Sequence, residues 1–269
     1  MIGNIIGDAA GSVYEFNNIK SKDFKIVNPN ADYTDDSILT IATADWILNG
    51  GDIAHIYSRY GNDNPCPMGG YGGGFARWLV VSQRIGDYSP YGSCGNGSAM
   101  RVGPVGWAFD TEADVLAKAK ESAECTHNHP EGIKGAQATA LAIFMARKGA
   151  SANEIRNRIT ELFDYDLSLS VDEIRPRYSW DGLDGIISGA TCQGSVPQAI
   201  VCALEATDFE DAIRNAVSIG GDSDTIACIA GGIAEARFGV PDNLRKWAES
   251  LLPTAFRDIL TAFESKFCK

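Results

Sequence analysis

The chain has 269 residues, 45% of them hydrophobic, and its 23 lysines and arginines against 35 aspartates and glutamates give a net charge of −12. Such an acidic chain is a poor partner for nucleic acid or for an anionic membrane surface, and we expect it to bind neither. No run of residues is long and apolar enough to cross a membrane, and the N-terminus lacks the basic segment of a signal peptide, so we expect a cytoplasmic protein.

The first predicted helix covers residues 3–16, where Gly3, Gly7 and Gly11 recur at every fourth position. Glycine weakens a helix by about 1 kcal/mol relative to alanine, so close packing against another helix, or space needed by a ligand, must compensate. Glu15 lies on this segment and, taken alone, is expected to be a solvated surface carboxylate.

An oxygen-rich segment, Thr34-Asp35-Asp36-Ser37, follows a polar surface loop and opens a helix that ends at Gly50-Gly51. Taken alone, these residues predict an N-cap and acidic side chains that favour the first turn of a helix. The glycine- and proline-rich loop 61–74 comes after a short helix and precedes another from Phe75 to Ser82. It is not a P-loop, because no Gly-Lys-Ser/Thr follows it, but its glycines indicate flexibility or the close approach of a ligand.

A further glycine-rich stretch, Gly95-Asn96-Gly97-Ser98, precedes a helix-like run that carries Met100 and Arg101. Free N–H groups at the start of a helix, with glycines for access, form a ready anion site, although ordinary turns also use Asn-Gly. His127 and His129 follow a helix that ends near Cys125. With only one other histidine in the chain, we favour ligand contact or capping over a zinc site for this pair.

The second half of the chain continues with helical patterns. A long helix starts at Pro130, and two capping boxes after it, Ser151/Glu154 and Ser170/Glu173, predict two further helices. The pattern then predicts helices over 197–206 and 209–219, and two terminal helices that begin at Pro241 and Pro253. No convincing alternating run predicts a strand. We therefore expect one all-α domain over residues 1–269, with about ten helices of ordinary length. The seven cysteines form no C-x-x-C pair, and Cys202 and Cys228 lie in apolar helical patterns, typical of buried free thiols in a reducing compartment.

The segment Gly220-Gly221-Asp222-Ser223-Asp224-Thr225 stands at the start of a helix rich in small residues. An N-cap requires only one oxygen, and this segment offers several. If its helix converges with the one that begins at Thr34, Asp35, Asp36, Asp222 and Asp224 form two pairs of carboxylates whose charge must be neutralised. Oxygen ligands favour Mg²⁺, Mn²⁺ or Ca²⁺ over zinc, and two such ions could activate water and polarise a substrate oxygen.

Five of these segments occur together, in one order, along nearly the whole chain: Gly7-Asp8…Gly11…Glu15, Thr34-Asp35-Asp36, Gly95-Asn96-Gly97-Ser98-Ala99-Met100-Arg101, Thr126-His127 and Gly220-Gly221-Asp222-Ser223-Asp224-Thr225. Each motif is weak alone, but the ordered set resembles the ADP-ribosylglycohydrolase family. That family includes the dinitrogenase-reductase-activating glycohydrolase and the ADP-ribosyl-acceptor hydrolases.

The resemblance implies a compact orthogonal all-α fold with two divalent cations, Mg²⁺ or Mn²⁺, at its centre. Its implied metal ligands are Thr34, Asp35, Asp36, Asp222, Asp224 and Thr225. It also implies that Glu15 is a metal ligand or an acid/base group, and that either Glu15 or a metal-held aspartate, Asp36 or Asp224, handles the proton in catalysis. The residues implied to bind substrate are Gly95, Asn96, Gly97 and Ser98 at the diphosphate of ADP-ribose, His127 at its nucleotide part, and Met100.

The activity that the resemblance implies is hydrolysis of the anomeric C–N or C–O bond of an ADP-ribosylated protein side chain, arginine or serine, or of a small ADP-ribose conjugate. Separately, we expect the protein to be a monomer. Some members carry an aspartate before the helix that follows the glycine-rich loop, but residues 68–75 contain no acid, so the linkage is left open. Two alternatives remain: a non-catalytic relative that binds ADP-ribose, and a metal-dependent phosphohydrolase that cuts the diphosphate.

Overall fold

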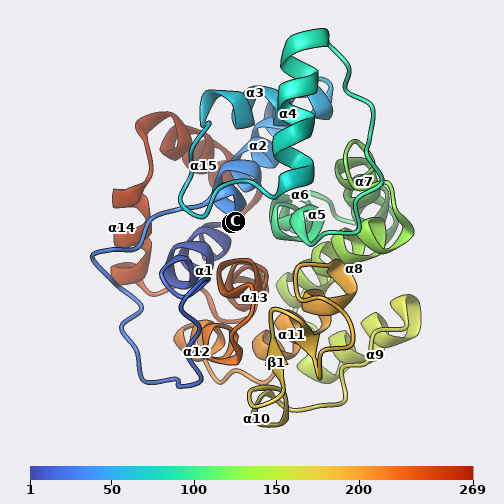
Figure 1. The fold of residues 1–269 in the computed structure, drawn as a ribbon. Coiled ribbons are helices and arrows are strands. Elements are labelled where there is room, and N and C mark those ends of the chain that lie inside the picture. The colour runs from blue at the N-terminus through green and yellow to red at the C-terminus, as the bar shows by residue number, and fades with distance from the viewer. Residues whose placement is uncertain (269) are drawn as a thin grey trace.

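The architecture is built around two helices that come from opposite ends of the chain. In the computed structural model, which describes residues 1–268, α1 (Ile2–Ser12) packs along α13 (Ser223–Phe238). Both helices lie near the middle of the molecule, and other helices surround them (Figure 1). All residues of α1 are buried, which is why its sequence lacks the polar face of a surface helix.

Small residues allow the α1 and α13 backbones to touch. A Cβ atom added to Gly7 would overlap the carbonyl oxygen of Ala227, and one added to Gly11 would overlap the backbone at Ser223 and Asp224. On the facing helix, a Cβ at Gly231 would overlap the carbonyl oxygen of Gly3. The predicted tight packing of the glycine face is therefore confirmed.

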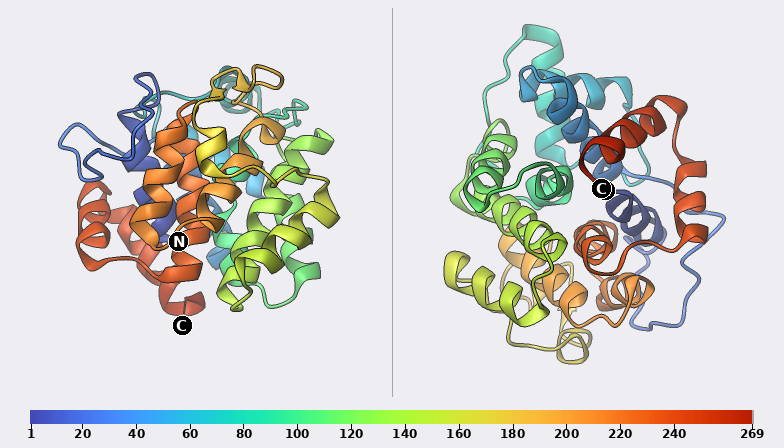
Figure 2. Two further views of the ribbon diagram at one scale, coloured as in Figure 1. Left: turned by 90° about the horizontal axis from the view of Figure 1, so that it is seen from below. Right: turned by 180° about the vertical axis from the view of Figure 1, so that it is seen from behind.

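Helix α13 also contacts α2, α5, α8, α11 and α12, and the view from behind in Figure 2 again places α1 beside it. The remaining helices in chain order are α2 (Asp35–Asn49), α3 (Ile53–Asp63), α4 (Gly73–Ile85), α5 (Gly97–Met100), α6 (Gly103–Ala108), α7 (Glu112–Glu124), α8 (Pro130–Arg147), α9 (Ala152–Phe163), α10 (Val171–Ile174), α11 (Cys192–Leu204), α12 (Phe209–Ile219), α14 (Asp242–Leu251) and α15 (Thr254–Phe267). Within residues 1–268 the only strands are β1 (Tyr178–Ser179) and β2 (Gly182–Leu183), which have two residues each and pair antiparallel. The all-α prediction is confirmed.

Three details of the prediction were wrong. The described residues form fifteen helices rather than about ten, partly because α5, α6 and α10 are too short to show a periodic pattern. Helix α1 ends at Ser12, so Glu15 lies just beyond it rather than on it. Helix α11 begins at Cys192 and contains Pro197, whereas the sequence pattern predicted a helix that starts at 197.

Two further predictions can be compared with the described residues. No helix in this part of the chain combines the length and the apolar character that a membrane span requires. All seven cysteines are free thiols, and Cys192, Cys202 and Cys228 are buried, which agrees with the predicted absence of disulfides.

Candidate active site

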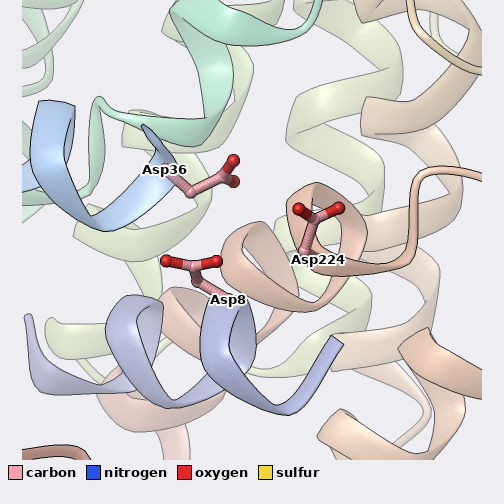
Figure 3. Close-up of side chains that lie close together, drawn as sticks. All are labelled: Asp8, Asp36 and Asp224. Carbon is pink, nitrogen blue, oxygen red and sulfur yellow. The ribbon is translucent and has the colours of Figure 1, made fainter. Parts of the chain in front are cut away.

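Three carboxylates from three helices meet in the interior. Asp8 of α1, Asp36 of α2 and Asp224 of α13 are buried, and one oxygen of each lies within 4.8 Å of the others. Figure 3 shows the three side chains directed toward one another. A second group with the same spacing combines Glu15, Asp222 and Asp224, so Asp224 belongs to both.

Hydrogen bonds fix the start of α2 against α1. Asp8 accepts hydrogen bonds from the amide of Thr34 at 2.9 Å, the hydroxyl of Thr34 at 2.7 Å and the amide of Ser37 at 3.0 Å, and also from the hydroxyl of Ser37. Thr34 is itself the N-cap of α2, because its hydroxyl oxygen accepts a hydrogen bond from the amide of Asp36. The capping role predicted from sequence is therefore present, and it also aims Asp36 at the cluster.

The start of α13 is joined to α2 and to the glycine-rich segment before α5. The hydroxyl of Thr225 donates to Oδ2 of Asp36 at 3.2 Å, and Nδ2 of Asn96 donates to Oδ2 of Asp222 at 2.7 Å. The two oxygen-rich helix starts thus converge, and Asp222, Asp224 and Thr225 face the interior, with exposed fractions of 8%, 3% and 3%.

The donor set fits a hard divalent cation. Oδ1 of Asp36 and Oδ1 of Asp224 are buried and have no hydrogen-bond partner within residues 1–268. A buried charged oxygen without a partner is unfavourable unless something neutralises it. Carboxylate and hydroxyl oxygens suit Mg²⁺ or Mn²⁺, and the acidic groups of the described residues contain no histidine or cysteine.

Burial raises the pKa of every carboxylate in the cluster, and for some of them the charges of neighbouring carboxylates add to the rise. Burial raises the pKa of Asp8 to about 6, although hydrogen bonds from Ser37 and Thr34 oppose the rise. Burial and then the negative charges of neighbouring carboxylates hold the pKa values of Asp36 and Asp224 well above their ordinary range. The pKa of Glu15 rises to about 7, first through burial and then through the charges of Asp222 and Asp8.

These shifts predict how the stability of the metal-free protein depends on pH. A carboxyl whose pKa is raised in the folded state stabilises the fold below its unfolded pKa of about 4, and this contribution is lost as pH rises through the folded value. In a chelator, Glu15→Gln should therefore match the wild type near pH 5. It should be more stable near pH 8 by about 1–2 kcal/mol, less than the full shift gives, because water screens the partly exposed Glu15.

Urea denaturation at the two pH values, with EDTA present, measures this difference. Excess Mn²⁺ should reverse the pH dependence for the wild type, because ionised carboxylates bind the cation and its affinity then rises with pH. Equal stability of the two proteins at pH 8 would contradict the raised pKa of Glu15.

A cavity of about 370 Å³ opens over the cluster. Glu15, Asp35, Asp36, Asp222 and Thr225 line it, whereas Asp8, Thr34 and Asp224 are not among its lining residues. Asp35 is half-buried and lies outside both carboxylate groups, but the charges of Asp8, Asp222 and Glu15 contribute, after burial, to raising its pKa.

The predicted glycine-rich loop forms one wall of this cavity. Residues 69–74 line it, and a Cβ at Gly69 would lie 2.6 Å from Oε2 of Glu15. Gly69 also has φ +77°, a left-handed conformation that favours glycine. The loops after α1, before α4 and before α11 lie on the same side of the molecule (Figure 2).

The predicted anion loop is only partly available to a ligand. The amide of Gly95 donates to the hydroxyl of Ser93, and the amide of Asn96 donates to the carbonyl of Ala190. Gly97 and Ser98 are the first two residues of α5, positions whose amides have no acceptor within a helix. The hydroxyl of Ser98 is buried and donates to the carbonyl of Gly132 at 2.7 Å, and Ser98 does not line the cavity.

Met100 and His127 both line the cavity, as expected for residues that contact a ligand. Nδ1 of His127 lies 2.8 Å from the hydroxyl oxygen of Thr126. Burial and the nearby Arg101 guanidinium hold the pKa of His127 well below its ordinary value, so the imidazole is neutral. His129 instead caps α8, with Nδ1 accepting the amide of Glu131, which agrees with the preference for capping over zinc.

Asp8 is the residue of the cluster to which sequence reasoning gave no role. It was noted only as part of the Gly7-Asp8 motif, yet it shares a group with Asp36 and Asp224. A signal was available: Asp8 is the only charged residue in the otherwise apolar and small segment 2–12. A charge in a helix without a polar face requires an internal partner.

The fold and the site define an all-helical protein with a buried carboxylate cluster, suited to cations, beneath a ligand-sized cavity. The model of the ADP-ribosylglycohydrolase family matches residues 1–268, and the chain belongs to that family. The predicted class of enzyme, a glycohydrolase, is thereby confirmed.

The relatives that the chain resembles have related names. It is 27% identical over 330 residues to "ADP-ribosylhydrolase ARH3" of Homo sapiens, with 97% of this chain and 90% of the relative covered. It is 26% identical to "ADP-ribosylarginine hydrolase Tri1" of Pseudomonas putida (strain GB-1), with 93% and 72% covered. A solved structure titled "ADP-ribosylglycohydrolase-related protein complex" matches with a TM-score of 0.69 at 22% identity, covering 99% of this chain and 96% of that one. This last likeness supports the fold.

Proposed function

We propose that this enzyme uses divalent cations to release ADP-ribose from a modified arginine or serine side chain, or from a small ADP-ribosyl conjugate. The reaction is hydrolysis of the anomeric C–N or C–O bond. The observation that carries the proposal is the pair of carboxylate groups that share Asp224 beneath the cavity, with Glu15 at its wall. Membership of the ADP-ribosylglycohydrolase family supports the choice of substrate.

We assign two cations, Mg²⁺ or Mn²⁺, to the carboxylate cluster. Their ligands are the predicted set, with Asp8 added because it shares a group with Asp36 and Asp224: Asp8, Thr34, Asp35, Asp36, Asp222, Asp224 and Thr225. When bound, such ions polarise substrate oxygens and lower the pKa of a coordinated water.

Glu15 is assigned the proton transfers. Its carboxylate lines the cavity and can accept a proton from water as the water oxygen bonds to the anomeric carbon. The bond from that carbon to the side-chain nitrogen or oxygen breaks, its electron pair leaves with the side chain, and the leaving atom takes up the proton that Glu15 has accepted from water. Positive charge on the ribose in the transition state is stabilised by the negative carboxylates around it, as in other glycosidic cleavage.

The diphosphate is assigned to the opposite part of the cavity wall. The amide of Gly97 and the ring of His127 provide donors there, while Gly95 and Asn96 hold the loop through their own hydrogen bonds. A cavity of about 370 Å³ is at the small end of the range for organic ligands, which suits partial enclosure of ADP-ribose.

Incubation with arginine- and serine-ADP-ribosylated proteins, with Mg²⁺, Mn²⁺ or EDTA, tests the proposal. We expect free ADP-ribose from at least one linkage, and only with a cation present. The name of the Pseudomonas putida relative specifies ADP-ribosylarginine, which makes the arginine-linked substrate the first to try. Release of AMP would instead indicate hydrolysis of the diphosphate, and calorimetric binding of ADP-ribose without turnover on any linkage would indicate a non-catalytic relative.

Glu15→Gln should lower kcat by about 100-fold or more, because it removes a general acid/base group and keeps the shape of the side chain. Affinity for ADP-ribose, measured by calorimetry, should change little. The matched control is Glu121→Gln. Glu121 is an exposed carboxylate of α7 that does not line the cavity, so this variant should retain wild-type turnover. A Glu15→Gln enzyme with near-normal kcat would remove Glu15 from the mechanism.

A further inference from the structure

Arg101 is a fully buried cation whose place in the fold is not explained by an ion pair. Within residues 1–268 no carboxylate forms a salt bridge with it, and its Nε and Nη1 atoms have no hydrogen-bond partner. Its guanidinium carbon lies 4.0 Å from the ring centroid of Tyr57. Its Nη2 atom donates to the carbonyl of Ser122 at 2.9 Å and to the hydroxyl oxygen of Thr126 at 2.7 Å.

Arg101 itself lines the cavity, and the hydroxyl of Thr126 connects it to His127, which lines the same cavity. Thr126 is fully buried, and its oxygen lies 2.8 Å from Nδ1 of His127. The hydroxyl proton requires an acceptor, and Nδ1 of His127, at 2.8 Å, is a far stronger acceptor than the neighbouring sulfur of Cys125. If Nδ1 carried the proton instead, Thr126 would accept from both neighbours and its own buried proton would be left without a partner.

We infer that Arg101 and Thr126 are positioning residues that fix neutral His127 as the Nε2–H tautomer, so that it donates one hydrogen bond to an acceptor oxygen of the ligand in the cavity. Arg101 occupies one lone pair of the Thr126 oxygen, and the Thr126 proton then occupies the lone pair of Nδ1. The positive charge of Arg101 and the burial of the ring disfavour a second proton on the imidazole.

The direction of Nε2 indicates the chemical class of its acceptor. A Cβ at Gly97 would lie 3.1 Å from Nε2, so the ring edge is adjacent to the start of α5. Gly97 lines the cavity, and the buried positive charge of Arg101 is close to the ring. An N–H donor beside a buried positive charge suits an anionic oxygen, such as that of a diphosphate. The choice of ADP-ribose as ligand rests on the proposed function, whereas the tautomer does not.

The ring ¹⁵N chemical shifts of His127, recorded near pH 8 without ligand, test the tautomer directly. We expect a protonated Nε2 and an unprotonated Nδ1 in the wild type, and a mixture or the opposite tautomer in Thr126→Val. Thr126→Ser should restore the wild-type pattern. His129 is an internal control, because its Nδ1 accepts the amide of Glu131 and should keep its shifts in all three proteins. A wild-type His127 protonated at Nδ1 would overturn the inference. This result comes from the wild-type spectrum alone, so it does not depend on whether the variants fold.

A binding measurement separates positioning from a purely structural role. Thr126→Val should weaken ADP-ribose binding about threefold to tenfold, as expected for one misdirected hydrogen bond, and should raise KM far more than it lowers kcat. Thr126→Ser should recover the affinity. Unchanged affinity in Thr126→Val, or equal losses in the two variants, would contradict the inference. If the wild type binds no ADP-ribose at all, the proposed ligand is wrong, while the ¹⁵N spectrum still decides the tautomer.

Discussion

Replacement of Asp36 or Asp224 with asparagine is expected to abolish ADP-ribose release and, in the absence of metal, to make the protein more stable. Both effects have one cause. The two carboxylates lie in a buried group with Asp8, and one oxygen of each has no hydrogen-bond partner within the described chain. An asparagine amide cannot neutralise a cation as a carboxylate does. In the absence of metal, however, the substitution removes a negative charge that the neighbouring carboxylates repel.

The expected magnitudes are large. Loss of a residue that only hydrogen-bonds to a metal ligand lowers metal affinity or activity by about 10- to 100-fold, so loss of a ligand itself should lower activity by more than about 100-fold. Removal of one buried, repelled carboxylate should raise the free energy of unfolding in EDTA by on the order of 1–3 kcal/mol. Release of ADP-ribose with excess Mn²⁺, and urea denaturation with EDTA or Mn²⁺, measure the two effects. Mn²⁺ should stabilise the wild type and have little effect on the variants.

Asp45 offers a control on the same helix as Asp36. It is also a largely buried aspartate, but it accepts hydrogen bonds from Arg59 at 2.6 Å and Tyr60 at 3.0 Å. Asp45→Asn should therefore destabilise the protein, because it weakens a satisfied ion pair, and should preserve turnover. If Asp224→Asn kept near-wild-type turnover with excess Mn²⁺, or lost stability in EDTA as Asp45→Asn does, the assignment of Asp224 to a cation would be wrong.

The local signals in the sequence were sufficient for the fold class and for much of the site. The sequence predicts a helix start at Thr34-Asp35-Asp36 and another at the segment that contains Asp222, Asp224 and Thr225. Each segment does begin a helix, and the two helix starts meet in the interior. Convergence itself could not be derived from spacing, since 186 positions separate Asp36 from Asp222 (222 − 36). It depended on the ordered resemblance to a family. Local pattern determines the start of a helix, but contacts distant in sequence determine its neighbours.

The errors have local physical causes. Asp8 was given no role because one acid in a helix of glycines and alanines produces no cluster in the sequence; its partners Thr34 and Ser37 come from another helix. The predicted anion site in the loop from Gly95 to Ser98 came without any sign that Ser93 and Ala190 accept the amides of Gly95 and Asn96. Ala190 lies almost a hundred residues away, so no reading of the motif could detect that the second amide was occupied.

Gly7→Ala is expected to destabilise the protein by about 3 kcal/mol or more, at the upper end of the range for overpacking. The added methyl group would overlap the carbonyl oxygen of Ala227, which is backbone and cannot move aside by a change of rotamer. The only relief is separation of α1 from α13. Alanine favours a helix by about 1 kcal/mol over glycine, so the measured loss is the clash less this gain.

The matched control is Gly73→Ala. Gly73 is also in a helix, α4, but a Cβ added there has no heavy atom within 4 Å. The substitution should be neutral or stabilising by up to about 1 kcal/mol, because it lowers the entropy of the unfolded chain. Urea denaturation of both variants in EDTA gives the comparison. If Gly7→Ala also proved neutral or stabilising, the contact between the two backbones would be wrong.

Gly7→Ala also tests whether the packing of α1 against α13 positions the carboxylates of the cluster. Asp8 follows Gly7 on α1, and Asp224 lies on α13, so separation of these helices must move the oxygens of Asp8 and Asp224 apart. Their present distance, within 4.8 Å, depends on helices that approach more closely than any side chain permits. Folded Gly7→Ala should therefore bind Mn²⁺ more weakly than Gly73→Ala at equal protein concentration. Calorimetric titration with Mn²⁺ at a temperature where both are folded tests this, and equal affinities would mean that the glycine face serves stability alone.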